Sequence, residues 1–256
     1  MTQEPINSPQ NEKLKLVRRL AEPRGRAAEG LFVSEGEDLL GAGLDAGWEP
    51  RLVLVAAGSG IEGVAVQPEL IERFSALGSG TRAIALWPLP DAASIGPDPA
   101  AGCIYLHGVA DPGNVGAIIR SATALTGSRV VLGSGCADPF SPKATRASMG
   151  ALFANPPRPG DVGSTPGPRL ALSAHGGSPL AEAIAENAPK TICLGAEREG
   201  LDEGVLGACE AEATISLRSQ AESLNVAATA AIVLHRICSS AVHPHPQTAA
   251  DKRDLS

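Results

Sequence analysis

Hydrophobic positions recur along this chain in short blocks, and the period of each block predicts the element that it forms. The N-terminal third alternates helix-like and strand-like blocks. Helices are predicted for the block that contains Leu14, Leu16, Val17 and Leu20, for Gly36–Ala46 and for Pro68–Leu77. Apolar runs predict strands at Leu31–Val33, Arg51–Ala56 and Thr81–Trp87. Pro23–Gly30 is predicted to break the first helix.

The C-terminal half continues this alternation. The predicted strands are Cys103–His107, Arg129–Leu132, Arg169–Ala174, Thr191–Gly195 and Ala213–Leu217. The predicted helices are Asn114–Thr126, Pro142–Phe153, Pro179–Asn187 and Glu222–Ser239. Strands separated by helices form parallel sheets that are covered on both faces. The sequence therefore predicts an α/β fold, with Asn155–Pro168 as a surface loop.

The segment Pro88–Gly102 separates the two regions. It is rich in Pro, Gly and Ala and has no apolar period, which is typical of a linker. The chain of 256 residues is thus divided into a small α/β domain over residues 11–87, a linker over 88–102 and a larger α/β domain over 103–240. Residues 241–256 are predicted to form a disordered tail.

Charge and composition narrow the possible functions. The net charge of −7 argues against a nonspecific polyanion-binding protein, and only 3% of the residues are aromatic, too few for a base-stacking surface. Basic residues nevertheless gather in two segments, Asn11–Gly30 and Pro112–Gly160. In the second segment the only acidic residue is Asp138. Local positive surfaces of this kind suit contact with RNA phosphates. The candidate RNA-binding residues are Arg18, Arg19, Arg24, Arg26, Lys143 and Arg146.

The cysteines and the chain start indicate a reduced, soluble environment. Cys103, Cys136, Cys193, Cys209 and Cys238 lie far apart and form no zinc-like pair, so buried thiols are expected and no metal site is predicted. Met1–Gln10 lacks the apolar core of a leader peptide, and no apolar run is long enough to span a bilayer. We therefore expect a cytoplasmic protein.

Three C-terminal segments place small and polar residues at the edges of apolar runs. The first, Asp111–Ala122, reads DPGNVGAIIRSA. Asn114 is expected to cap its helix, and Arg120 falls away from the apolar stripe that the helix buries. Taken alone, this pattern favours a capped surface helix whose arginine is merely solvated over a functional site.

The other two segments are Lys143–Phe153, which reads KATRASMGALF, and Leu194–Leu201 (LGAEREGL) together with Ser223–Ala227 (SLNVA). In the last of these, polar residues open a long Ala-rich helix, whose free backbone N–H groups can bind polar ligand atoms. Ser223 as a simple cap and Glu197 as a surface acid are the structural alternatives.

Together the three segments resemble the three motifs of the SpoU (TrmH) family of RNA ribose methyltransferases. The resemblance implies a trefoil-knotted SPOUT catalytic domain, a homodimer with its S-adenosylmethionine pocket at the dimer interface, and methyl transfer to a ribose 2′-hydroxyl in RNA. It implies catalytic roles for Asn114, Arg120, Glu197, Ser223 and Asn225. It places the cofactor near Ala174, Gly195, Ile215, Leu217 and Leu224. The N-terminal segments Phe32–Gly36 (FVSEG) and Arg24–Arg26 are similar to the L30e-like RNA-recognition domain of related enzymes.

Two departures from the motifs and several alternatives remain. The stretch Arg218–Glu222 is less glycine-rich than is usual in the family. Ile215, Ser216 and Leu217 stand where the family usually has Ile-Pro-Met, which leaves that loop less rigid. No GxGxxG, GxxxxGK[ST] or GxSxG pattern indicates a dinucleotide enzyme, an NTPase or a serine hydrolase. A noncatalytic RNA-binding protein with the same fold and a methyltransferase acting on a base are the competing interpretations. His107 ends a strand and His175 follows another, so either can line the pocket, although a structural role is favoured for both.

Overall fold

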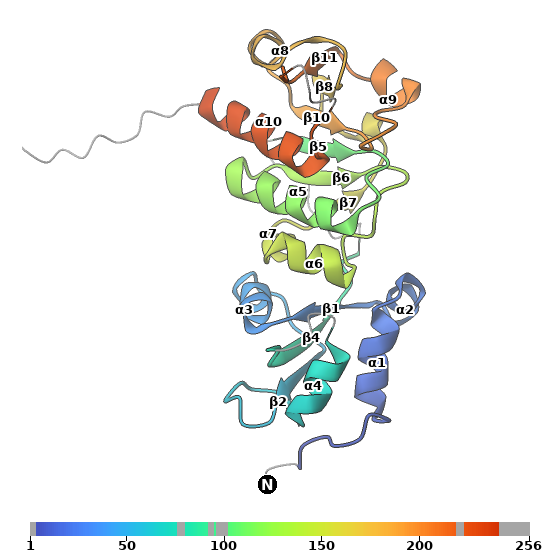
Figure 1. The fold of residues 1–256 in the computed structure, drawn as a ribbon, viewed down its shortest axis with the longest axis vertical. Coiled ribbons are helices and arrows are strands. Elements are labelled where there is room, and N and C mark those ends of the chain that lie inside the picture. The colour runs from blue at the N-terminus through green and yellow to red at the C-terminus, as the bar shows by residue number, and fades with distance from the viewer. Residues whose placement is uncertain (1–3, 76–79, 92–94, 96–101, 219–222, 241–256) are drawn as a thin grey trace, which may run out of the picture.

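The protein folds into two lobes stacked along its long axis (Figure 1). The computed structural model describes residues 4–75, 80–91, 95, 102–218 and 223–240. The predicted disordered tail and most of the predicted linker lie outside the described residues. No helix within these ranges is long and apolar enough to cross a membrane.

The N-terminal lobe contains a four-stranded sheet in the order β1 (Leu31–Glu35), β4 (Ala83–Pro88), β2 (Leu52–Ala56), β3 (Val64–Val66). Strand β4 runs antiparallel to β1 and β2, whereas β2 and β3 are parallel. The surrounding helices are α1 (Glu12–Leu20), α2 (Pro23–Glu29), α3 (Glu37–Asp45) and α4 (Pro68–Phe74). The first helix ends before Pro23, as predicted, but Pro23–Gly30 is not only a break: Pro23 starts α2, and Gly30 ends it in the left-handed conformation.

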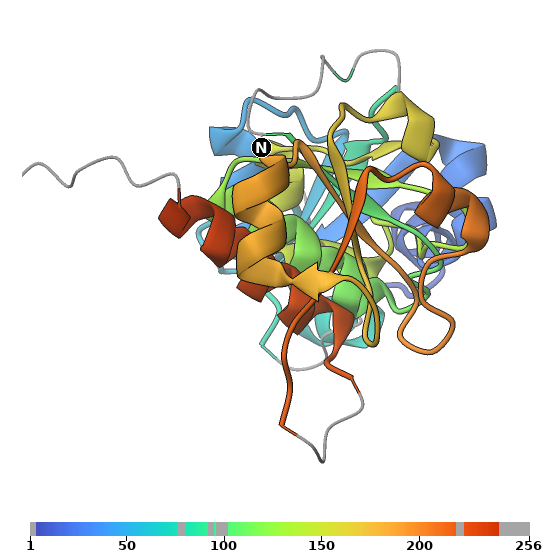
Figure 2. The ribbon, with the colours of Figure 1, turned by 90° about the horizontal axis from the view of Figure 1, so that it is seen from above.

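The C-terminal lobe contains a seven-stranded sheet in which every described pair is parallel, as predicted for an α/β fold. The strand order is β7 (Arg158–Pro159), β6 (Arg129–Leu132), β5 (Cys103–Leu106), β10 (Thr191–Leu194), β8 (Arg169–Leu172), β11 (Ala211–Thr214), β9 (Ser178–Pro179). The helices are α5 (Pro112–Leu125), α6 (Pro142–Ser148), α7 (Ala151–Ala154), α8 (Leu180–Asn187), α9 (Glu203–Gly207) and α10 (Val226–Ser240), with a 3-10 turn at Val162–Ser164. Seen from above, α8 and α10 lie on the opposite side of the strands from α9 (Figure 2).

Two predicted elements have different boundaries for identifiable reasons. The single helix expected over Pro142–Phe153 is two helices, because Met149 and Gly150 have φ values of 49° and 89° and interrupt the turn. The predicted strand Ala213–Leu217 instead covers Ala211–Thr214, so Ile215 and Leu217 lie in the segment that follows it. Helix α9 and strand β3 are too short to give a periodic signal in the sequence.

An aromatic cluster joins the lobes. Five of the seven aromatic residues of the chain form it: Phe32, Trp48, Trp87, Phe140 and Phe153. The rings of Trp87 and Phe153 lie 4.9 Å apart, and the Trp48 indole N–H donates to the Phe153 carbonyl at 3.0 Å. Aromatic pairs of this kind contribute about 0.5–1.5 kcal/mol beyond the area that they bury. One hydrophobic cluster therefore extends across both lobes.

Candidate functional site

A cavity of about 530 Å³ opens beside the carboxyl ends of β8 and β10 and the start of α10. Crevices outside the carboxyl ends of parallel strands are the usual ligand sites of open α/β sheets. All five residues predicted to contact the cofactor line this cavity, namely Ala174, Gly195, Ile215, Leu217 and Leu224. The predicted catalytic residues Glu197 and Ser223 line it as well.

The loop between β10 and α9 forms one wall of the cavity. Ala196 and Gly200 exchange two backbone hydrogen bonds, of 3.2 and 3.0 Å, and close the loop into a tight turn. A Cβ atom added at Gly195 would overlap the carbonyl of Gly200. Gly195 is thus required for the backbone of the loop to approach itself, before any ligand is considered.

Asn114, Glu197 and Asn225 form a triangle of side chains beside the cavity. The Asn114 amide donates to Glu197 Oε1 at 2.9 Å, and the Asn225 amide donates to the same oxygen at 2.8 Å. The Asn225 amide also lies 3.1 Å from Asn114 Oδ1, which accepts from it. The structure therefore brings together residues from three separate segments of the chain. Asn114 comes from the first motif, 83 positions before Glu197, and Asn225 lies 28 positions after Glu197 in the second segment of the third motif.

Helix capping determines how the two asparagines are presented. The sequence predicted that Asn114 caps α5, and this prediction was wrong. Asp111 is the cap, and its Oδ1 accepts from the Gly113 and Asn114 N–H groups. The Asn114 side chain is therefore available to Glu197. At α10, Asn225 Oδ1 accepts from the backbone N–H groups of Ala227 and Ala228, at 2.9 and 3.3 Å, while its amide holds Glu197.

Lys143 supports this arrangement from α6. Its Nζ lies 2.9 Å from Asp111 Oδ2. The hydrogen bond from Lys143, together with those from the Asn114 and Gly113 N–H groups, holds the pKa of Asp111 below its ordinary value. Helices α5 and α6 approach closely at Gly116, where a Cβ would overlap the Ala144 carbonyl.

Arg120 does not reach the cavity of its own chain. It is exposed on α5 and has no hydrogen bond or ion pair with any residue that the structure describes. Six residues separate it from Asn114, which places it about 9 Å further along the helix and on another face. The structure thus unites four of the five predicted catalytic residues around one cavity and leaves the fifth apart.

Four of the six predicted RNA-binding residues form ion pairs within the chain. Arg19 pairs with Glu29, Lys143 with Asp111 and Arg146 with Asp38, all at exposed positions and at 2.9 Å. Arg18 lies over the ring of Phe74, and Arg24 is exposed on α2. Arg26 has a different role from the one expected: only 2% of it is exposed, and it binds Asp138. A buried, paired guanidinium is not available to a phosphate, so Arg26 leaves the candidate RNA surface.

Sequence reasoning missed some residues of the cavity. Ser173 and Thr229 line it without having been predicted, and His175, for which a structural role was favoured over a place in the pocket, is exposed and lines it too. Thr229 lies one helical turn after Asn225, a spacing that could have identified it. His107 lies outside the cavity, and its Nε2 is 3.1 Å from Asp202 Oδ2.

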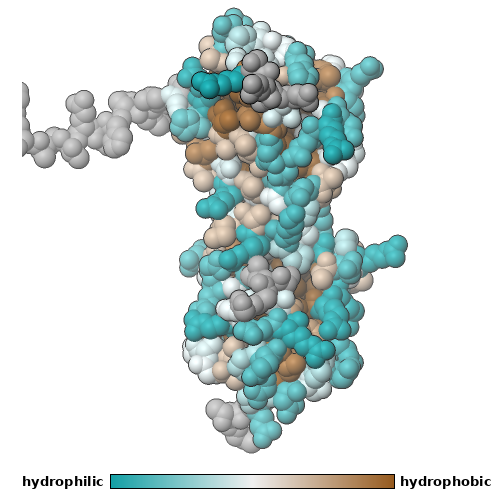
Figure 3. Space-filling model, viewed as in Figure 1, coloured by the Kyte–Doolittle hydropathy of each residue, from teal (hydrophilic) through white to brown (hydrophobic). Residues whose placement is uncertain are grey.

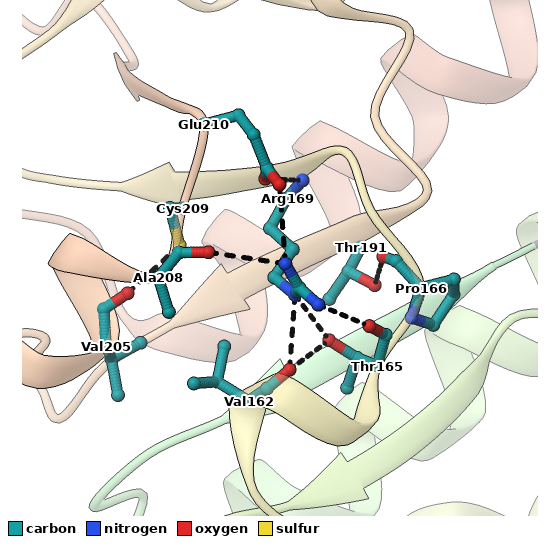
Figure 4. A network of polar contacts seen from close by, with 9 residues as sticks. All are labelled: Val162, Thr165, Pro166, Arg169, Thr191, Val205, Ala208, Cys209 and Glu210. Carbon is teal, nitrogen blue, oxygen red and sulfur yellow. Dashed lines mark hydrogen bonds and ion pairs between the residues drawn. The ribbon is translucent and has the colours of Figure 1, made fainter.

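The opposite ends of the strands carry a second polar network, centred on Arg169 (Figure 4). The guanidinium donates to the carbonyls of Val162 and Thr165 at 3.2 and 2.8 Å, and its Nη1 lies 3.3 Å from Glu210 Oε1. The Arg169 backbone N–H also donates to Glu210 Oε2. This network ties the 3-10 turn to the starts of β8 and β11, and neither Arg169 nor Glu210 lines the cavity described above.

Residues 102–235 match the model of the SpoU rRNA Methylase family. The chain belongs to this family. The prediction from the three motifs is therefore confirmed. The chain is similar to the 23S rRNA (guanosine(2553)-2′-O)-methyltransferase RlmP of Bacillus subtilis. The two sequences are 28% identical over an alignment that covers 91% of this chain and 98% of that protein.

Solved structures of RNA methyltransferases agree with the fold. A putative RNA methyltransferase of the TrmH family from Porphyromonas gingivalis is 30% identical and superposes with a TM-score of 0.75, over 90% of this chain and 98% of that one. An AdoMet-bound rRNA methyltransferase from Sinorhizobium meliloti, 24% identical, has a TM-score of 0.83 over 94% and 99% of the two chains. The predicted α/β architecture is confirmed, whereas the knot stays a prediction.

Proposed function

We propose that this SpoU-family protein transfers a methyl group from S-adenosylmethionine to a ribose 2′-hydroxyl in ribosomal RNA. The observation that carries the proposal is the triangle of Asn114, Glu197 and Asn225 beside a cavity lined by the third motif. The similarity to a chain named as a 23S rRNA 2′-O-methyltransferase supports ribosomal RNA as the substrate class.

The cavity suits the cofactor. Its volume of about 530 Å³ falls within the usual range for small-molecule sites, roughly 300–1,000 Å³. Ile215, Leu217 and Leu224 give it apolar walls for an adenine ring, while Glu197 and Ser223 add polar groups at one side. S-adenosylmethionine supplies an activated methyl group when it is bound.

Positioning accounts for the roles of the protein groups. Glu197 is held by two amide donors, so its carboxylate is fixed before a substrate arrives. An arginine stays protonated under ordinary conditions, so Arg120 orients the ribose and its phosphate and stabilises developing negative charge. Holding the hydroxyl in line with the methyl group supplies most of the rate enhancement.

The position of Arg120 supports a homodimer in which each site uses two chains. Arg120 is remote from its own cavity but projects from α5, the neighbour of α10. Ile232 on α10 is 42% exposed, and apolar surface is visible on the C-terminal lobe at the level of this helix (Figure 3). We infer that a second copy docks there and brings its Arg120 to the cavity.

Mixing two inactive variants tests this arrangement. Arg120→Ala and Asn225→Asp copies, refolded together, regain about one quarter of wild-type activity if a site combines Arg120 of one chain with Asn225 of the other. Half of the dimers are then mixed, and one of the two sites in each is intact. No recovery above the separate variants contradicts sites shared between chains.

The N-terminal lobe is proposed to capture RNA through exposed arginines, with Arg24 on α2 as the clearest candidate. Charge reversal by Arg24→Glu should weaken RNA binding and flatten its salt dependence, because fewer counterions are released. The matched control is Arg51→Glu, a reversal at an exposed arginine elsewhere in the same lobe. An unchanged salt slope for Arg24→Glu would assign RNA capture to the C-terminal lobe. Action in the cytoplasm stays a prediction.

Two measurements test the proposed function itself. Calorimetry should detect S-adenosylmethionine binding, and mapping of 2′-O-methyl groups should find one ribosomal ribose that loses its methyl group when the protein is removed. Absence of cofactor binding would indicate a noncatalytic RNA-binding protein. A missing methyl group on a base would indicate the other enzyme class.

A further inference from the structure

Arg26 is the most deeply buried charged side chain in the described part of the N-terminal lobe, and all of its donors face protein. Its Nη1 donates to the carbonyls of Leu20 and Ala21, both at 2.8 Å, at the C-terminal end of α1. Its Nε and Nη2 donate to Asp138 Oδ2 at 2.8 and 2.5 Å. The side chain therefore joins the end of α1 to a residue 112 positions away in the other lobe.

Asp138 belongs to the turn that starts α6. Its Oδ1 accepts from the Phe140 N–H at 2.8 Å, and its carbonyl accepts from the N–H of Ser141, the cap of α6. Phe140, two residues away, places its ring 5.0 Å from that of Phe32 on β1. The turn is thus attached to the N-terminal lobe at two adjacent points, one ionic and one apolar.

Helix α6 continues this connection to the catalytic triangle. Lys143 in its first turn binds Asp111, and Asp111 caps α5 through the N–H groups of Gly113 and Asn114. Asn114 then donates to Glu197. A contiguous series of hydrogen bonds, backbone turns and one closely packed helix pair therefore runs from α1 to the wall of the cavity.

We propose that Arg26 and Asp138 are a positioning pair that sets where RNA held by the N-terminal lobe meets the catalytic triangle. The inference rests on the proposed function. A displacement of about 1 Å between reacting groups is enough to cost on the order of a hundredfold in rate. A rigid ionic joint between the lobe that captures RNA and the turn before α6 thus determines which ribose reaches the methyl group.

The second ionic contact between the lobes is less suited to this role. Arg146 and Asp38 are 41% and 47% exposed, whereas Arg26 is 2% and Asp138 34% exposed. Exposed pairs hold their geometry weakly because water and salt compete for both charges. The buried pair has four protein hydrogen bonds on its guanidinium and so defines one orientation.

The test is Asp138→Asn in the full-length protein. The asparagine carbonyl can still accept from Phe140, so the turn is kept, but the charge opposite Arg26 is removed. The matched control is Asp45→Asn, the same change at an exposed acid of the N-terminal lobe that has no ion pair in the described structure. Thermal melts set a temperature at which both variants are fully folded.

At that temperature, three properties are measured. We expect S-adenosylmethionine affinity within about twofold of wild type, because the cavity wall is intact. Single-turnover methylation with saturating RNA should fall by roughly 10–100-fold, and methyl groups should appear on neighbouring riboses. Amide hydrogen exchange should speed up in the first turn of α5. Asp45→Asn should change none of these.

Unchanged single-turnover rate and methylation site in a folded Asp138→Asn protein would overturn the positioning role. The positioning role would also be overturned if the loss of rate in Asp138→Asn were fully explained by weaker S-adenosylmethionine binding. The substitution would then act on the cavity and not on the placement of RNA. If wild type methylates no ribose, the proposed function fails instead. The exchange measurement still decides the linkage in that case: faster exchange in α5 supports it, and unchanged exchange overturns it.

Discussion

The two ends of the parallel sheet carry polar networks that satisfy their members to different degrees. At the amino ends, the guanidinium of Arg169 has protein acceptors on Nε, Nη1 and Nη2. Glu210 accepts once from this guanidinium and once from the Arg169 backbone N–H. At the carboxyl ends, the triangle around Glu197 lies beside a cavity, and only Oε1 of this carboxylate has a protein donor in the described structure. A network closed on itself serves stability, whereas one with an unused acceptor beside a cavity is prepared for a ligand.

This comparison predicts separable effects. Substitutions at the carboxyl ends should reduce ligand affinity or turnover and leave stability nearly unchanged. Substitutions at the amino ends should do the reverse. Four variants test the separation.

The largest effect is expected for Asn225→Asp. Aspartate caps helices as well as asparagine does, so α10 should keep its start. The new carboxylate, however, faces Glu197 Oε1 at the 2.8 Å position of the former amide donor. Repulsion should open the triangle and lower single-turnover methylation by about 10³-fold, with a small change in melting temperature. Asn187→Asp, the same change on α8 away from the cavity, is the control.

Second is Arg169→Met, the counterpart at the amino ends. The carbonyls of Val162 and Thr165 lose their side-chain donor, and Glu210 loses the guanidinium but keeps the backbone N–H of residue 169. Because Arg169 is 18% exposed, the expected loss of unfolding free energy is about 2–3 kcal/mol. Denaturant titration measures it, and S-adenosylmethionine affinity of the folded variant should match wild type. A large loss of cofactor affinity without destabilisation would contradict the separation.

Third is Gly195→Ala, which probes the cavity wall. The added Cβ overlaps the Gly200 carbonyl, so the tight turn over residues 195–201 must open. Cofactor affinity should fall by roughly tenfold or more, as seen by calorimetry, while the unfolding free energy should fall by only about 1 kcal/mol. Gly207→Ala, at a glycine with open space around its Cβ position, is the control.

The sequence predicted which residues line the cavity better than it predicted the contacts between them. Gly195 and Leu224 were assigned from motifs, and both line the cavity. The motif could not show that Gly195 faces Gly200, because that contact depends on how the loop closes. The prediction of Asn114 as a cap failed for a different reason. Asp111 and Asn114 both suit the cap position, and only the start of the helix at Pro112 decides between them.

The fold was predictable where blocks were long and periodic. Strand β5 and helix α5 were located within three residues of their observed ends. Helix α2 was missed because its sequence, PRGRAAE, contains Pro and Gly and no large apolar residue, and strand β3 because it has only three residues. The burial of Arg26 could not be predicted from the residues around it in the sequence. A basic segment suggests a solvated surface, and its partner Asp138 lies 112 positions away.

The smallest effect is expected for Glu210→Gln, and it depends on pH. The hydrogen bond from the Arg169 backbone N–H, with the charge of the Arg169 guanidinium, lowers the pKa of Glu210 in the folded protein. A carboxyl whose folded-state pKa is depressed stabilises the fold above its unfolded pKa and loses this contribution as pH falls through the folded value. Wild type should therefore melt slightly above Glu210→Gln near pH 7, and the difference should shrink between about pH 5 and pH 3. Glu203→Gln, at an exposed acid of α9, should show no such convergence. A difference that grows on acidification would show that Glu210 is not stabilised as a carboxylate at the amino ends of the sheet.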